Sequence, residues 1–137
     1  MANPLLHKHD VILVAKPWRG GLAQYLFNGL QELGLGNVQW WPSYPVRPAE
    51  RLSYLRDKRA WRRDLVERIN RETNATVICV NPLAEFAELN AHPRLLAWLT
   101  DDPRHANHIL APYSRVYISD PGYAADMAAA HAAQYAA

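Results

Sequence analysis

Trp98-Leu-Thr-Asp-Asp-Pro103 is an apolar run that stops at two acidic residues and a proline. Tyr117-Ile-Ser-Asp-Pro-Gly-Tyr123 ends in a similar way, and Val11-Ile-Leu-Val-Ala-Lys-Pro-Trp-Arg-Gly-Gly21 is an apolar run that leads to a glycine pair. Short apolar runs bounded by turn residues are typical of strands buried in a parallel sheet. The ends of such strands open onto a ligand crevice. The three stretches therefore predict a parallel sheet with a functional site along one edge.

The remaining chain alternates between strand-like and helix-like segments. Five strands are predicted, at Val11–Ala15, Asn37–Trp41, Ala75–Val80, Arg94–Leu99 and Arg115–Ser119. Helices are predicted at Leu22–Leu33, at Pro48–Arg71, near Ala84–Asn90 and over the alanine-rich Tyr123–Ala137. This alternation indicates an α/β fold, a Rossmann-like three-layer sandwich with a five-stranded, mostly parallel sheet. The strand order is 2-1-3-4-5 or 3-2-1-4-5, and the long apolar third strand favours the first.

The composition indicates one domain of ordinary size. The chain has 137 residues, half of them apolar, which is enough for one core. Its formal net charge is only +2, so no nucleic-acid partner is expected. The single cysteine, Cys79, lies in an apolar run and is expected to be a core residue. No signal peptide or membrane span is recognisable, so a cytoplasmic location is expected.

The loop Lys16–Gly21 connects the first predicted strand to the first helix. Amides at a helix N-terminus attract anions, and Gly20 and Gly21 would let a ligand approach closely. Arg19 offers a guanidinium for a phosphate or carboxylate, and Trp18 offers a ring for stacking on a sugar. The alternative for Gly20 and Gly21 is a tight turn that merely needs glycine. The alternative for Trp18 is a ring that covers the core. The loop matches neither the dinucleotide-binding glycine pattern nor the Walker pattern.

Acidic residues follow the fourth and fifth predicted strands. Asp102 and Asp120 each precede a proline, which suits the N-cap of a following helix. Asp101 has no such capping role, so we expect it to act as a base or to hold a ligand hydroxyl, with an ion pair as the alternative. His105 is a candidate proton shuttle or a surface residue. It lies three residues before His108, but no third ligand with suitable spacing follows, so no metal site is predicted.

Basic residues concentrate in Arg47–Arg71, which holds nine of the fifteen lysines and arginines. Asp57, Asp64 and Glu67 are interspersed among them, which favours a solvated helix of mixed charge. The alternative is a contact with a membrane surface or a protein. The residues that would make this contact are Arg56, Arg59, Arg62 and Arg63.

The glycine-pair loop, the Trp98–Pro103 exit and the Val116–Tyr123 exit together resemble the N-terminal half of glycosyltransferases related to spore-maturation protein CgeB. The resemblance covers most of Asp10–Tyr123, and Asp-Asp-Pro is its most specific motif. That family has two Rossmann-like domains of the GT-B type, the first mainly for the acceptor and the second mainly for the nucleotide-sugar donor. The resemblance implies that the cleft is lined by Gly20, Gly21, Asp101 and Asp102, with Asp120 and Tyr123 near it.

The resemblance also implies a function. The chain would be the acceptor-side domain of an enzyme that transfers a sugar from a nucleotide-sugar donor to a hydroxyl acceptor, without a further cofactor. Asp101 or Asp102 would be the catalytic base. These 137 residues cannot hold a donor domain as well, so the chain is expected to be inactive alone. The other hypothesis is a non-catalytic protein- or ligand-binding module that uses the arginine-rich helix 47–71.

Overall fold

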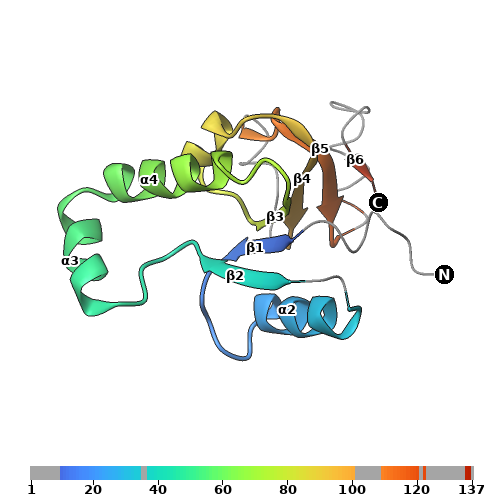
Figure 1. Ribbon diagram of the computed structural model, residues 1–137, viewed down its shortest axis with the longest axis horizontal. Helices are drawn as coiled ribbons and strands as arrows, with labels where there is room; N and C mark the ends of the chain where they lie inside the picture. The colour runs from blue at the N-terminus through green and yellow to red at the C-terminus, as the bar shows by residue number, and fades with distance from the viewer. Residues whose placement is uncertain (1–9, 35–36, 101–108, 121, 123–134, 137) are drawn as a thin grey trace.

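One parallel sheet organises the chain into a Rossmann-like α/β sandwich (Figure 1). The computed structural model describes residues 10–34, 37–100, 109–120, 122 and 135–136. Within these residues, six strands pair in parallel in the order β2-β1-β3-β4-β5-β6. The strands are β1 (Val11–Ala15), β2 (Val38–Pro42), β3 (Thr76–Val80), β4 (His92–Leu99), β5 (Tyr113–Ile118) and β6 (Tyr135–Ala136).

The five predicted strands are confirmed, and their order is the favoured one, 2-1-3-4-5. The sixth strand corrects the prediction of a helix up to Ala137. Tyr135 and Ala136 pair with Val116 and Tyr117 of β5. This pairing gives backbone partners to a strand that would otherwise be an exposed edge. The other residues of that predicted helix, 123–134 and 137, lie outside the described residues.

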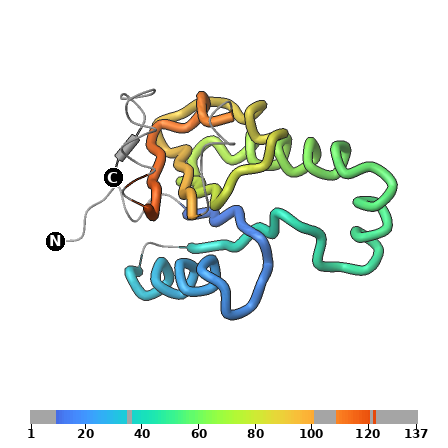
Figure 2. Tube along the Cα trace, turned by 180° about the vertical axis from the view of Figure 1, so that it is seen from behind, coloured from blue at the N-terminus to red at the C-terminus, as the bar shows by residue number. Residues whose placement is uncertain are grey.

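Helices cover both faces of the sheet (Figures 1 and 2). Helix α2 (Leu22–Glu32) lies on one face near β2, where the rings of Phe27 and Trp40 have centroids 5.6 Å apart. Helix α4 (Lys58–Asn70) and the 3-10 helix η1 (Ala84–Glu88) lie on the other face. Helix α3 (Pro48–Arg56) projects beyond the sheet.

Helices α3 and α4 replace the single helix that was predicted over Pro48–Arg71. The break is at Asp57, whose extended backbone (φ −153°, ψ 94°) ends α3 and starts α4. Its Oδ1 accepts a hydrogen bond from the Ala60 amide at 3.1 Å. Aspartate is a preferred N-cap, so a residue assigned from sequence to a solvated surface in fact begins a second helix.

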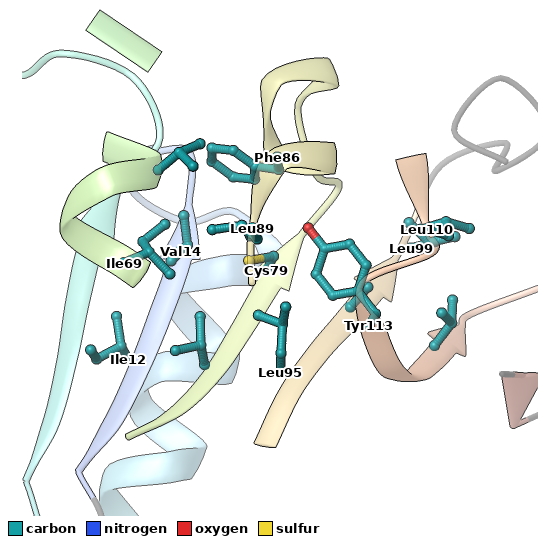
Figure 3. Close-up of a cluster of buried hydrophobic side chains, with 14 of the residues drawn as sticks. Ile12, Val14, Ile69, Cys79, Phe86, Leu89, Leu95, Leu99, Leu110 and Tyr113 are labelled. Atoms are coloured by element: carbon teal, nitrogen blue, oxygen red, sulfur yellow. The ribbon is translucent and has the colours of Figure 1, made fainter. Parts of the chain in front are cut away.

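The main core lies between the sheet and the layer formed by α4 and η1 (Figure 3). Apolar side chains of β1, β3, β4 and β5 pack there against Leu65, Val66 and Ile69 of α4. Phe86 of η1 is 1 % exposed and Tyr113 is 2 % exposed. Cys79 is fully buried in this core, as predicted from its apolar run.

The burial of Cys79 leads to a prediction about its reactivity. Burial raises the pKa of its thiol from the ordinary 9.0 to about 12, and a hydrogen bond with the Tyr113 hydroxyl opposes only part of this rise. Figure 3 shows the Tyr113 ring beside the sulfur. Because thiolates are the reactive species, we predict that native Cys79 resists Ellman's reagent near pH 8 and reacts fully after unfolding in urea.

The same shift makes stability depend on pH. The folded-state pKa of Cys79 lies above its unfolded value, so its contribution to stability is complete below about pH 9 and is lost as the pH rises towards about 12. Rapid reaction of Cys79 in the native protein with Ellman's reagent near pH 8 would contradict its buried position.

Candidate functional site

The loop Lys16–Gly21 between β1 and α2 forms one side of the candidate site. Gly20 has φ +72°, a left-handed conformation that favours glycine. Gly21 is the N-cap of α2 and has an extended backbone. Among the described residues, no side chain caps this helix end, and its first turn carries no acidic residue. The start of α2 therefore offers amide donors to an anion or a hydroxyl oxygen.

Asn81 joins the ends of β3 and β4 on the other side of the site. Its φ of +49° lies in the left-handed region, which asparagine tolerates better than most residues. Asn81 Nδ2 donates to Thr100 Oγ1 at 2.7 Å, and the Thr100 amide donates to Asn81 Oδ1 at 2.9 Å. The Asn81 amide also donates to the Trp98 carbonyl at 2.9 Å. These bonds fix Thr100, which immediately precedes Asp101 in the sequence.

A cavity of about 440 Å³, here called the edge cavity, lies between these two parts. Helix α2 follows β1 on one face of the sheet and η1 follows β3 on the other, so this is the switch point where open α/β sheets bind ligands. The cavity is lined by Lys16, Trp18, Asn81 and Thr100, together with Ala15, Gly21, Leu22, Ala23, Val80, Pro82 and Leu83. Its volume suits a small molecule.

A groove of about 790 Å³, here called the α3–α4 groove, is bounded by the segment after β2 and by the two helices. Its lining includes the aromatic residues Tyr44 and Trp61. Its charged lining residues are Arg47, Glu50, Asp64 and Arg68. Within the described part of the chain, these charged groups form no ion pair with one another. They therefore keep their hydrogen-bonding capacity for a ligand.

Ring contacts link the edge cavity to the α3–α4 groove. The ring centroids of Trp18 and Tyr44 are 5.5 Å apart. The ring of Tyr54 lies 5.1 Å from Tyr44 and 5.6 Å from Trp61. Trp18 borders the cavity, whereas Tyr44 and Trp61 border the groove, so these ring contacts connect a lining residue of the cavity to lining residues of the groove.

Two residues predicted to bind the acceptor, Trp18 and Gly21, line the edge cavity. Gly20 forms the turn between them in the same loop. Arg19 instead borders a shallow pocket of about 280 Å³ together with Pro17, Gln24, Trp40 and Pro42. Trp18 and Arg19 of this loop therefore line different hollows, the edge cavity and the shallow pocket.

Asp120 has a local role in the structure. Its Oδ1 accepts a hydrogen bond from the Gly122 amide at 2.8 Å, which is the local side-chain-to-backbone bond of an Asx turn. Four further predicted residues lie outside the described residues: Asp101, Asp102, His105 and Tyr123.

Three residues with polar side chains that line the edge cavity were not predicted as site residues: Lys16, Asn81 and Thr100. Each lies directly after an apolar run, as Asp101 lies near the end of one. The same pattern, applied to the end of every predicted strand, would have selected Lys16, Asn81 and Thr100. The hydrogen bonds between Asn81 and Thr100 depend on the pairing of β3 with β4, which the sequence does not specify.

The four arginines proposed for partner contact differ in their surroundings. Arg62 is 25 % exposed, lies 3.4 Å from Glu85 Oε2, and donates to the Tyr54 hydroxyl at 3.2 Å. Its guanidinium therefore ties α4 to η1 and α3. Arg56, Arg59 and Arg63 are exposed.

Comparison with models of protein families, with curated proteins and with solved structures finds no match. In the described ranges, no group of three His, Cys, Asp or Glu residues is placed to hold a metal ion. In the same ranges, no helix is long and apolar enough to cross a bilayer. What the chain binds must be inferred from the chemistry of the edge cavity and the α3–α4 groove.

Proposed function

We propose that this chain is the acceptor-side domain of a two-domain glycosyltransferase of the GT-B type, and that the edge cavity holds a hydroxyl-bearing acceptor. The observation that carries the proposal is the position of the cavity. It lies at the switch point of the sheet, and Thr100 in its lining immediately precedes the Asp101-Asp102 pair.

The lining of the edge cavity suits a hydroxylated ligand. Trp18 is 52 % exposed, and the C–H face of a sugar can stack on such an indole ring. The Lys16 ammonium and the amides at the start of α2 are donors for hydroxyl oxygens. Thr100 Oγ1 accepts a bond from Asn81 and keeps its own proton to donate.

The α3–α4 groove supports an acceptor longer than one sugar. Aromatic rings beside carboxylates and guanidinium groups can stack on a sugar and also bond its hydroxyls. The ring contact between Trp18 of the edge cavity and Tyr44 of the groove supports one acceptor that reaches both.

We assign the chemical step to Asp101. Its carboxylate would accept the proton of the acceptor hydroxyl while the hydroxyl oxygen attacks the anomeric carbon of the donor sugar. The bond from that carbon to the nucleoside diphosphate breaks, and the diphosphate leaves with the bonding electron pair. Asp102 is assigned to the N-cap before Pro103. The donor is assigned to a second domain outside these 137 residues.

The test is saccharide binding by this chain, measured by saturation-transfer NMR with a panel of methyl glycosides. We predict weak binding of at least one glycoside and a loss of roughly tenfold in affinity for Trp18→Ala, because the stacking surface is removed. Tyr25→Ala is the matched control, since Tyr25 is 67 % exposed on α2 and does not line the edge cavity.

Either of two outcomes would remove the proposal. One is the absence of binding to every glycoside of the panel. The other is binding that Trp18→Ala and Tyr25→Ala affect equally, because the edge cavity would then not be the binding site.

A further inference from the structure

Helix α3 exposes two leucines to solvent. Its buried residue is Tyr54, which is 7 % exposed. By the helical period, the side opposite Tyr54, here called the outer face of α3, consists of Pro48, Ala49, Leu52, Leu55 and Arg56. All five are exposed, Leu52 by 62 % and Leu55 by 73 %. A helix that only supported the fold would direct such leucines inwards.

Contacts on the inner side hold α3 in this orientation. Tyr54 packs against the rings of Tyr44 and Trp61, and its hydroxyl accepts a bond from Arg62. Arg51 Nε donates to the Pro45 carbonyl at 3.5 Å. The outer face is therefore presented by a helix that is fixed to the domain.

Basic side chains surround the outer face. From Val46 to Arg63 the sequence has seven lysines and arginines and two acidic residues, a net charge of +5. The whole chain carries +2, so the rest of it carries −3. The exposed basic residues at the corner between α3 and α4 are Arg56, Lys58, Arg59 and Arg63. This separation of charge favours a negatively charged partner at the corner.

The position of α3 makes this surface accessible. Figures 1 and 2 show α3 and the start of α4 projecting away from the sheet. A flat surface can meet the outer face of α3 before it meets the sheet layers. An acidic protein partner would need a complementary surface of about 800 Å² on each side, which a single projecting helix face of nine residues does not offer.

We propose that the outer face of α3 docks on an anionic membrane surface. Leu52 and Leu55 enter the headgroup region, while Arg56, Arg59 and Arg63 contact lipid phosphates. Apolar side chains flanked by arginines are what an interfacial helix needs for this contact. The inference is independent of the edge cavity and of sugar transfer.

Vesicle co-sedimentation of the full chain tests the proposal. We expect binding to phosphatidylcholine vesicles that contain about one third phosphatidylserine, weak binding to phosphatidylcholine alone, and release as salt shortens the Debye length. The double variant Leu52→Glu with Leu55→Glu should weaken the partitioning at least about tenfold. The triple variant Arg56→Glu, Arg59→Glu and Arg63→Glu should abolish it.

The matched control is Tyr25→Glu with Leu33→Glu. It adds the same two charges at Tyr25 of α2 and at Leu33, the C-cap residue of α2, which are 67 % and 69 % exposed, and it should keep binding. Thermal melting by circular dichroism checks that every variant is folded. Three outcomes overturn the proposal: no binding to anionic vesicles, equal loss in the control, or binding to an acidic protein without binding to vesicles.

Discussion

Asp101→Asn is expected to lower the rate of sugar transfer about 10²- to 10⁴-fold in the proposed two-domain glycosyltransferase. Asparagine has the shape of aspartate, but its amide cannot take the proton of an acceptor hydroxyl. The melting temperature should stay the same, because Asp101 precedes the residue that suits the helix cap. The measurement is the initial rate of transfer at saturating donor.

Asp102→Asn is the matched control for this substitution. Asparagine caps a helix about as well as aspartate, so both stability and transfer should change little. Undiminished transfer in Asp101→Asn would remove the base role assigned to that residue. A loss confined to Asp102→Asn would place the base at the second position.

The second large effect is expected in the core. Phe86→Ala should lower the free energy of unfolding by about 3–5 kcal/mol, because Phe86 is 1 % exposed and its removal leaves a cavity between η1 and the sheet. Domains of this size have about 5–15 kcal/mol in total, so the variant should be close to unfolding. Urea denaturation followed by circular dichroism measures the change.

Leu55→Ala is the control for the core substitution. Leu55 is 73 % exposed, so the free energy of unfolding should change by no more than about 0.5 kcal/mol. If Phe86→Ala also changed it by less than about 1 kcal/mol, η1 would not be packed on the core as described.

The strands were predictable because burial on both faces leaves a plain signal, whereas the sequence left two strand orders open. Val11–Ala15 is buried at all five positions, and it appears in the sequence as an unbroken apolar run. Such a run needs no knowledge of its neighbours to be recognised. The short β6 could not be predicted in this way, because Tyr135 and Ala136 are paired through β5 rather than through a pattern of their own.

The break between α3 and α4 was missed for a different reason. Lysines and arginines on both sides of Asp57 hide any apolar period, so the segment was predicted as one helix. The signal present was the cap itself, an aspartate that accepts a bond from the amide three residues later.

The candidate site was predicted in part. Trp18 and Gly21 belong to one loop, and a loop between a strand and a helix can be read from local sequence. Asn81 and Thr100 lie 19 residues apart and meet only because β3 and β4 are neighbours. That pairing occurs in only one of the two strand orders that the sequence left open, so the two side chains could not be assigned to one site from local sequence.

The ring contacts that run from Trp18 through Tyr44 and Tyr54 to Trp61 have a mechanical consequence. Tyr44 lines the α3–α4 groove, so a shift of Trp18 by a ligand in the edge cavity would change a ring contact made by a residue of the groove. Such a contact would couple the binding of ligands in the two hollows. By linkage, each ligand would then change the affinity of the other by the same factor.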